Sequence, residues 1–217
     1  MKYQHLFFDL DGTLVDSQEG IQNAVCHAMD RMGVSRDKLG DIKRYIGPPL
    51  VVSFTEFWDL TPGQGRQAVD YYREYYTEKG WQQVRVYDGM VQTLQGLQQM
   101  GAGLYVVTSK PTVYAQKILQ HYGLAPYFKT IRGVSFQKDE ETKQSLLQSV
   151  LEEHGIRELS ACVMIGDRCH DMEAAKQVGT AAMGALYGFG TAQELEQAGA
   201  DMLVHGPLDI LRINQEA

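Results

Sequence analysis

The chain has 217 residues, of which 44% are hydrophobic and 22% charged, a composition typical of globular proteins that excludes a disordered chain. Twenty basic residues stand against 27 acidic ones, giving a formal net charge of −7 without any run of Lys or Arg. This balance excludes a broad nucleic-acid or anionic-membrane surface.

The cysteines and the lengths of the apolar segments indicate the cellular compartment in which the protein works. Cys26, Cys162 and Cys169 are odd in number and lack CxxC spacing, which argues against a disulfide framework and a zinc site. The N-terminal stretch is too polar for a signal peptide, and no window approaches the roughly 20 apolar residues of a membrane span. We therefore expect a soluble protein of the reducing cytoplasm.

The N-terminal third begins with a strand and continues with helices. Tyr3 to Phe8 form a short apolar run that predicts a buried strand, and Ser17 is the predicted N-cap of a helix that ends at Gly33. Residues 34–80 contain no convincing strand. Their predicted helices cover Lys38 to Tyr45, Leu50 to Trp58 and Gly65 to Lys79, separated by "GPP" and "TPG".

After "RVYDG" the pattern changes to strands alternating with helices. The predicted strands cover Gly103 to Val107, Lys129 to Val134, Ala161 to Ile165 and Thr180 to Leu186. The predicted helices cover Met90 to Gln99, Thr112 to Tyr122, Glu141 to His154 and Met172 to Val178. This alternation predicts an α/β fold with a mostly parallel sheet, which the first strand must join. The core should therefore comprise residues 1–16 and 87–217, with residues 17–86 as a helical insertion.

Polar side chains follow three of the predicted strands. In an open parallel sheet, ligands bind beyond the carboxyl ends of the strands, so these residues should gather at one rim. The residues are Asp9 and Asp11 in "DLDG", Thr108, Ser109 and Lys110 in "VVTSK", and Asp167 with the nearby Asp171 in "GDRCHD".

Four carboxylates at one rim would repel one another without a cation. Asp9, Asp11, Asp167 and Asp171 form an oxygen-only set, which favours a hard ion, most plausibly Mg²⁺. If Leu10 stays extended, the two-residue period of a strand places the side chains of Asp9 and Asp11 on one side.

Each motif alone has an ordinary structural explanation. "DLDG" can be a turn after a strand, Asp167 a helix N-cap, and Thr108 and Ser109 capping residues before a helix. Their joint occurrence at strand ends favours a shared site. A lysine is also needed to balance a phosphoryl group, and we prefer Lys143 over Lys110 and Lys138 because it opens the helix after the third core strand.

Together, "DLDGTLVDS", "VVTSK", a lysine before a helix, and "GDRCHD" resemble the four motifs of the haloacid dehalogenase superfamily. The stretches "RYIGPPLVVSF" and "ALYGFGTAQELEQAGAD" resemble its phosphoglycolate phosphatase and 5′-nucleotidase-like branch. The resemblance implies a Rossmann-like core with an inserted helical cap domain. Two departures are Ser109, where many relatives have Asn, and a lysine motif without a following Pro.

The resemblance also implies roles for individual residues. Asp9 would be the nucleophile that forms an aspartyl-phosphate, and Asp11 the general acid and then base. Thr108 would bind phosphate and Lys143 would neutralise charge. Asp167 and Asp171, with Asp9 and Asp11, would hold Mg²⁺. The residues expected to contact substrate are Gly12, Thr13, Ser109, Lys110 and, in the cap, Arg44.

These roles predict a magnesium-dependent phosphomonoester hydrolase acting on a small phosphorylated metabolite such as phosphoglycolate or a nucleoside monophosphate. A phosphomutase remains open, since it differs in whether water or a sugar hydroxyl takes the phosphoryl group. A phosphonatase would need a cap lysine, and nothing singles out Lys38 or Lys43. A non-hydrolytic phospho-acceptor or binding module is the alternative from another class. We expect no nucleic-acid or membrane partner, and either a monomer or a homodimer.

Overall fold

The computed structural model describes residues 1–135 and 141–216. The chain forms two compact units, one of Met1–Val15 with Val86–Ala217 and one of Asp16–Arg85. Two short strands lie where the chain passes between the units, β2 (Val15–Asp16) and β3 (Arg85–Val86), and they pair with each other.

The first unit is built on a six-stranded sheet in the order β5-β4-β1-β6-β7-β8, and every strand pair in it is parallel. The predicted α/β fold is therefore confirmed. β1 is an inner strand, and its three apolar residues, in "LFF", are fully buried, as expected for a strand that is covered on both faces. The strands are β1 (His5–Phe8), β4 (Gly103–Pro111), β5 (Thr130–Val134), β6 (Cys162–Gly166), β7 (Ala181–Ala185) and β8 (Met202–Val204).

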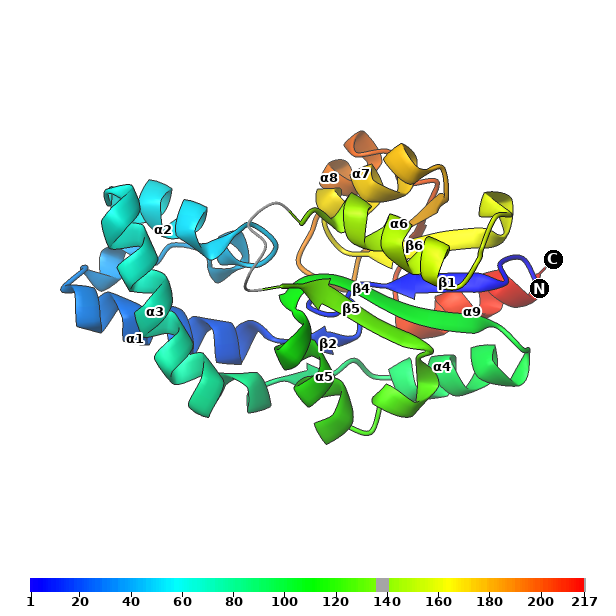
Figure 1. The fold of residues 1–217 in the computed structure, drawn as a ribbon, viewed down its shortest axis with the longest axis horizontal. Coiled ribbons are helices and arrows are strands. Elements are labelled where there is room, and N and C mark those ends of the chain that lie inside the picture. The colour runs from blue at the N-terminus through cyan, green and yellow to red at the C-terminus, as the bar shows by residue number, and fades with distance from the viewer. Residues whose placement is uncertain (136–140, 217) are drawn as a thin grey trace. The chain divides into compact units, whose positions relative to one another are not determined.

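Helices cover both faces of this sheet (Figure 1). On one face lie α6 (Lys143–Glu153), α7 (Cys169–Val178) and α8 (Ala192–Gln197), packed on a buried cluster that includes Phe7, Tyr105 and Met164. On the other face lie α4 (Met90–Gln99), α5 (Thr112–His121) and α9 (Pro207–Gln215). Successive strand residues point to opposite faces, so each strand contributes to both layers.

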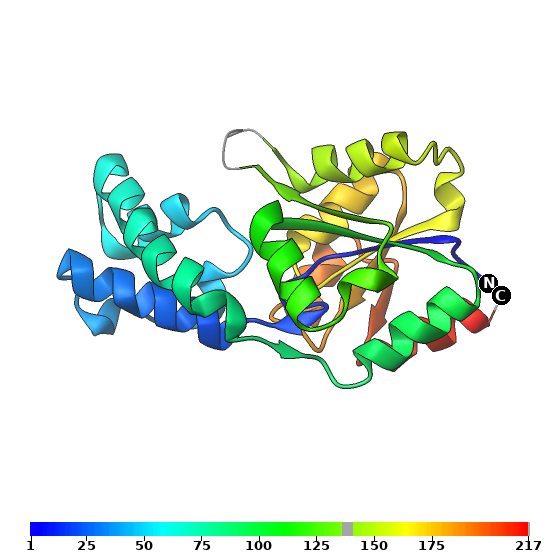
Figure 2. The same cartoon turned by 60° about the horizontal axis from the view of Figure 1, so that its bottom comes forward.

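α9 and β8 were not predicted from the sequence. In Figure 2, α9 and α4 lie side by side, close to the first residues of the chain. The buried Asn214 of α9 accepts a hydrogen bond from the Tyr3 backbone N–H through its Oδ1, at 2.6 Å. This long-range contact is invisible to a local sequence pattern.

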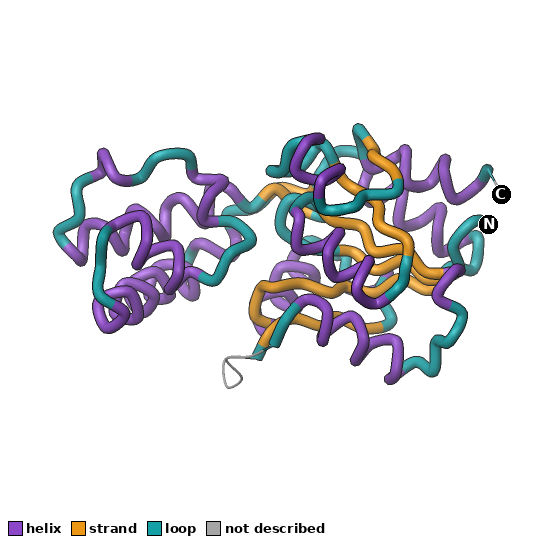
Figure 3. The backbone as a smooth tube through the Cα atoms, turned by 90° about the horizontal axis from the view of Figure 1, so that it is seen from above, coloured by secondary structure: helices purple, strands orange, loops and turns teal. Residues whose placement is uncertain are grey.

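The second unit is helical, as expected for this segment (Figure 3). It contains α1 (Gln18–Met32), α2 (Leu50–Trp58) and α3 (Pro62–Glu78), with short 3₁₀ helices at Arg36–Lys38, Ile42–Tyr45 and Gly80–Gln82. Its core is aromatic. The rings of Phe54 and Trp58 stack at 4.3 Å, and Trp58 Nε1 donates to Tyr45 Oη at 3.0 Å.

One helix predicted within this unit was wrong. The helix expected over Lys38 to Tyr45 is divided in two, because Gly40 adopts a positive φ of 57° and the Asp41 side chain accepts the Lys43 N–H at the start of the second piece. Ser17 is the N-cap residue of α1, as predicted, but its buried hydroxyl makes no hydrogen bond with any described residue, so the side chain does not cap the helix. No helix within the described ranges combines the length and apolarity of a membrane span.

Candidate active site

Asp9 is the first residue beyond β1. Its backbone N–H donates to the Ile165 carbonyl of β6 at 2.9 Å, so the parallel ladder fixes its position even after the strand ends. Its carboxylate is buried, with Oδ2 lying 2.9 Å from Lys143 Nζ. Oδ1 makes no hydrogen bond with any described residue. Asp9 therefore presents one bound and one unsatisfied oxygen at the end of the central strand.

The chain turns sharply after Asp9. Leu10 bends, and its carbonyl accepts the N–H groups of Thr13, Leu14 and Val15. Gly12 has a positive φ of 80°, and its N–H donates to the Val15 carbonyl at 2.8 Å. A left-handed conformation of this kind favours glycine.

The turn determines which backbone donors are left for a ligand. Among the described residues, the N–H groups of Leu10 and Asp11 form no hydrogen bond, whereas those of Gly12 and Thr13 are consumed within the turn. The Thr13 hydroxyl is buried without a partner. The N–H groups of Gly12 and Thr13 are thus already used within the turn, and the donors left for a ligand are those of Leu10 and Asp11, two residues earlier.

The structure separates Asp11 from the other predicted metal ligands. Asp11 Oδ2 pairs with Lys110 Nζ at 2.7 Å, and Oδ1 is buried without a hydrogen bond to any residue that the structure describes. The prediction that all four carboxylates share one group was wrong for this side chain. The physical reason is the bend at Leu10, which ends the two-residue strand period that would have kept Asp11 on the side of Asp9.

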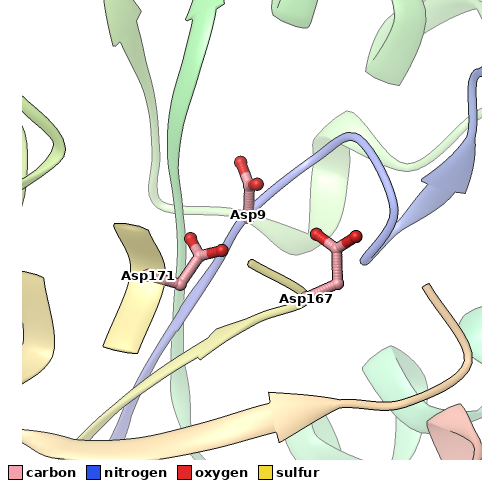
Figure 4. A group of neighbouring side chains, drawn as sticks. All are labelled: Asp9, Asp167 and Asp171. Atoms are coloured by element: carbon pink, nitrogen blue, oxygen red, sulfur yellow. The ribbon is translucent and has the colours of Figure 1, made fainter. Parts of the chain in front are cut away.

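The other three carboxylates do converge. Asp9, Asp167 and Asp171 each bring a carboxylate oxygen within 4.8 Å of the others, and all three are buried. In Figure 4 they point into one shared space from the end of β1, the end of β6 and the start of α7. Two of the three strand-end motifs that were predicted to meet, "DLDG" and "GDRCHD", thus bring carboxylates together.

Hydrogen bonds fix the orientation of Asp167 and Asp171. Asp167 Oδ2 accepts the Phe189 backbone N–H at 2.8 Å, and its Oδ1 is buried without a hydrogen bond. Asp171 accepts the Arg168 N–H at 3.1 Å through Oδ2, and Lys143 Nζ at 2.6 Å through Oδ1. Lys143 is the first residue of α6, which begins with a capping box of Thr142 and Ser145.

The Lys143 ammonium contacts Asp9 Oδ2 and Asp171 Oδ1, so it bridges these two carboxylates.

Burial dominates the electrostatics of this group. Burial and the charges of Asp171 and Asp9 raise the pKa of Asp167 well above its ordinary value. Burial also raises the pKa of Asp171 to about 6, with Lys143 opposing the rise and Asp9 adding to it. Burial alone would lower the pKa of Lys143, but the charges of Asp171 and Asp9 outweigh it and raise that pKa, so the lysine stays charged.

These residues fit a divalent cation. One lysine faces three buried carboxylates, which leaves an excess of negative charge, and two oxygens in the group, Asp9 Oδ1 and Asp167 Oδ1, lack any partner among the described residues. Oxygen-only donors of this charge suit a hard cation.

The remaining predicted residues lie in different places. Thr108 is buried at the rim end of β4, its Oγ1 accepts the Lys110 N–H at 3.2 Å, and the half-buried Ser109 lies between them. Because β4 runs on to Pro111, the residue that precedes α5, neither Thr108 nor Ser109 caps that helix. Lys138 lies outside the described residues.

Arg44 belongs to the second unit. Its guanidinium donates to the Lys38 carbonyl and to Tyr45 Oη, and lies 4.1 Å from the centroid of the Phe57 ring. Both hydrogen bonds come from Nη2, whereas Nε is buried without a hydrogen bond to any described residue.

Sequence analysis used the segment that follows β7 only for the family resemblance and gave it no role in the site. Phe189 binds Asp167, and Tyr187 Oη donates to the Thr13 carbonyl at 3.0 Å. The signal was available: "LYGFG" follows a predicted strand, and the rule that directs attention to strand ends applies to it as well. Its aromatic and glycine residues carry no charge, so a search for ionisable groups passed over them.

The profile of the family described as "Haloacid dehalogenase-like hydrolase" matches residues 6–185. The chain belongs to this family. The resemblance predicted from four short motifs is confirmed, and the matched residues include every carboxylate and lysine of the site described above.

Relatives and solved structures agree with this assignment. The chain is 37% identical to a 5′-nucleotidase of Pseudomonas aeruginosa, with 90% of the chain and 88% of the relative covered. It is 27% identical to a phosphoglycolate phosphatase of Vibrio parahaemolyticus, covering 95% and 93%. A crystal structure of a predicted phosphatase from Clostridium acetobutylicum superposes over the whole of both chains, with a TM-score of 0.92 and 36% identity. This haloacid dehalogenase-like chain is thus an enzyme of a hydrolase family with phosphatase-named relatives.

Proposed function

We propose that this protein is a magnesium-dependent phosphomonoester hydrolase that works through an aspartyl-phosphate on Asp9. The observation that carries the proposal is the buried group of Asp9, Asp167 and Asp171 around Lys143, at the end of the central parallel strand. Phosphoryl transfer needs a positioned nucleophile and concentrated positive charge more than elaborate covalent chemistry, and this group supports both.

The metal ligands in this proposal are Asp9, Asp167 and Asp171. When bound, Mg²⁺ would supply positive charge that the phosphoryl oxygens need. Lys143 would add further positive charge, because its ammonium contacts the proposed nucleophile at Asp9 Oδ2. The free N–H groups of Leu10 and Asp11 are donors for phosphate oxygens, as backbone amides are at many anion sites.

In the first step, an Asp9 carboxylate oxygen forms a bond to phosphorus while the bond to the substrate oxygen breaks, and Asp11 gives that leaving oxygen a proton. In the second step, Asp11 takes a proton from water, whose oxygen attacks phosphorus and releases Asp9 and inorganic phosphate. Asp11 Oδ1 accepts no hydrogen bond from residues 1–135 and 141–216 and is available for these transfers, while Lys110 Nζ pairs with Oδ2.

The proposed substrate is a small phosphomonoester. Both named relatives act, by their names, on such compounds, and the higher identity favours a nucleoside 5′-monophosphate over phosphoglycolate. The helical unit of Asp16–Arg85 is the proposed cap that selects among them. The acceptor in the second step is water, which separates this proposal from a phosphomutase and from a non-hydrolytic phospho-acceptor.

The test is release of inorganic phosphate from a panel of nucleoside monophosphates, phosphoglycolate, pyrophosphate and sugar phosphates. We expect steady multiple-turnover release with Mg²⁺, and loss of that release in EDTA that returns when Mg²⁺ is added in excess. Isomerised sugar phosphate without free phosphate would indicate a mutase. Phosphate release that is indifferent to EDTA would contradict the metal assignment.

Stabilisation by Mg²⁺ should depend on pH. Without metal, the folded Asp171 keeps its proton up to a pKa of about 6, above the ordinary value of 3.8, so this carboxyl stabilises the metal-free fold at low pH and that contribution is lost as pH rises through 6. Mg²⁺ needs the ionised carboxylates, so the Mg²⁺-induced rise in Tm should be larger near about pH 7.5 than near about pH 5. Thermal melts with and without MgCl₂ measure this. An equal rise at both pH values would contradict it, and Asp167→Asn should show little rise at either.

A further inference from the structure

The segment Tyr187–Gly190 joins β7 to α8 at the rim that carries the site. We propose that this segment is a positioning element that holds Asp167 and the Gly12–Thr13 turn in register for metal binding and catalysis. The inference rests on the proposed function, and it assigns a task to residues that carry no charge and do no chemistry themselves.

The segment fixes Asp167 through its backbone. The Phe189 N–H donates to Asp167 Oδ2 at 2.8 Å, which leaves Oδ1 as the oxygen for a metal. A methyl group at Gly190 would lie 2.0 Å from the Asp167 carbonyl oxygen. This contact is too close for any side chain, so glycine lets the segment lie directly against the aspartate.

Gly188 touches both parts of the site at once. A methyl group there would lie 2.3 Å from the Gly12 carbonyl oxygen and 2.4 Å from Asp167 Cβ. Gly12 in turn lies against Asp167, since a methyl group at Gly12 would be 2.0 Å from Asp167 Oδ2. Three backbone segments thus meet where only glycine fits, and a displacement of one must displace the others.

Tyr187 links the segment to the turn after the nucleophile. Its Oη donates to the Thr13 carbonyl at 3.0 Å, and its ring packs edge-on against Tyr87 with centroids 4.9 Å apart. Burial raises the pKa of this phenol well above its ordinary value, so it remains a donor at any working pH. The hydroxyl therefore works as a permanent link between the segment and the turn.

The far end of the segment is anchored as well. Thr191 caps α8 by accepting the Glu194 N–H at 3.1 Å. Glu194 Oε1 then accepts Arg168 Nε at 2.8 Å and the Cys169 N–H at 3.0 Å, which ties α8 to the stretch between Asp167 and Asp171. The segment is thus held at both of its ends by contacts with the residues around Asp167 and Asp171. Hydrogen bonds to the residues that bind a metal orient those residues.

Two variants test the inference, each with a matched control. Tyr187→Phe removes only the hydroxyl, and Tyr105→Phe is its control because Tyr105 Oη pairs with His5 Nδ1 at the opposite end of the sheet. Gly188→Ala inserts a methyl group against Gly12 and Asp167, whereas Gly206→Ala, in the same unit, meets no atom within 4 Å. The readouts are the Kd for Mg²⁺ by calorimetry, kcat, KM and Tm.

We expect Gly188→Ala to weaken Mg²⁺ binding by about 10- to 100-fold, and Tyr187→Phe to lower kcat by about tenfold with little change in KM, while both controls match the wild type. Variants that fold with a lower Tm but keep the wild-type Kd and kcat would reduce the segment to a structural element and overturn the inference. A wild-type protein that neither binds Mg²⁺ nor releases phosphate would overturn the proposed function and this inference together. Wild-type activity with unchanged variants would overturn this inference alone.

Discussion

Asp9→Asn is expected to lower kcat/KM for phosphate release by at least about 10⁴-fold, because the amide keeps the size of the side chain but removes the nucleophile. The fold should survive. The Asp9 charge raises the pKa of both Asp167 and Asp171, so its removal relieves repulsion in the metal-free site. We expect a Tm at or above that of the metal-free wild type, measured beside initial rates of phosphate release.

A matched control for this variant is Asp70→Asn, which changes an exposed carboxylate on α3 that lies 4.0 Å from Arg73 Nη1. It should retain wild-type rates. Equal phosphate release from Asp9→Asn and the wild type, both freed of contaminating phosphatase by gel filtration, would contradict the nucleophile assignment. It would then point to direct attack by water.

Lys143→Met should lower kcat by about 10²- to 10³-fold, the usual cost of removing one charged or hydrogen-bonding group that stabilises a transition state. The thioether fills similar space but brings no charge to Asp9 Oδ2 or Asp171 Oδ1. Because Lys143 opposes the rise in the pKa of Asp171, its loss should raise that pKa further. The acidic limb of the pH profile of kcat/KM is therefore expected to move to higher pH.

The control for Lys143→Met is Lys176→Met, since Lys176 lies on α7 in the same unit but pairs with Asp201 at the surface. It should leave the rate and the pH profile unchanged. A Lys143→Met protein with kcat within about threefold of the wild type would show that the lysine stabilises the buried carboxylates without serving the reaction.

Sequence reasoning succeeded where one rule about parallel sheets was sufficient. The carboxyl ends of β1 and β6 are adjacent in the sheet, so Asp9 and Asp167 meet whatever the details of the loops. The choice of Lys143 also came from its position at the start of a helix, and in the structure it contacts both Asp9 and Asp171.

The same reasoning was wrong where one residue changed the local backbone. The bend at Leu10 turned the Asp11 side chain to Lys110, and the positive φ of Gly40 divided a predicted helix. Both events depend on a single backbone conformation that a pattern of apolar spacing does not register. α9 depends on contacts across the whole chain, such as the Asn214 side chain accepting the Tyr3 N–H, and β8 on pairing with β7.

The strand order affects how the protein can fold during its synthesis on the ribosome. β1 is the first core strand to be synthesised, yet its two neighbours in the sheet, β4 and β6, begin at Gly103 and Cys162. At about 5–20 residues per second, the apolar "LFF" run and Asp9 precede the complete β6 strand by roughly 8–30 s of synthesis. Asp9, Asp167 and Asp171 can therefore come together only after most of the polypeptide has emerged, and a nascent chain that stalls earlier exposes the apolar residues of β1 before this group has formed.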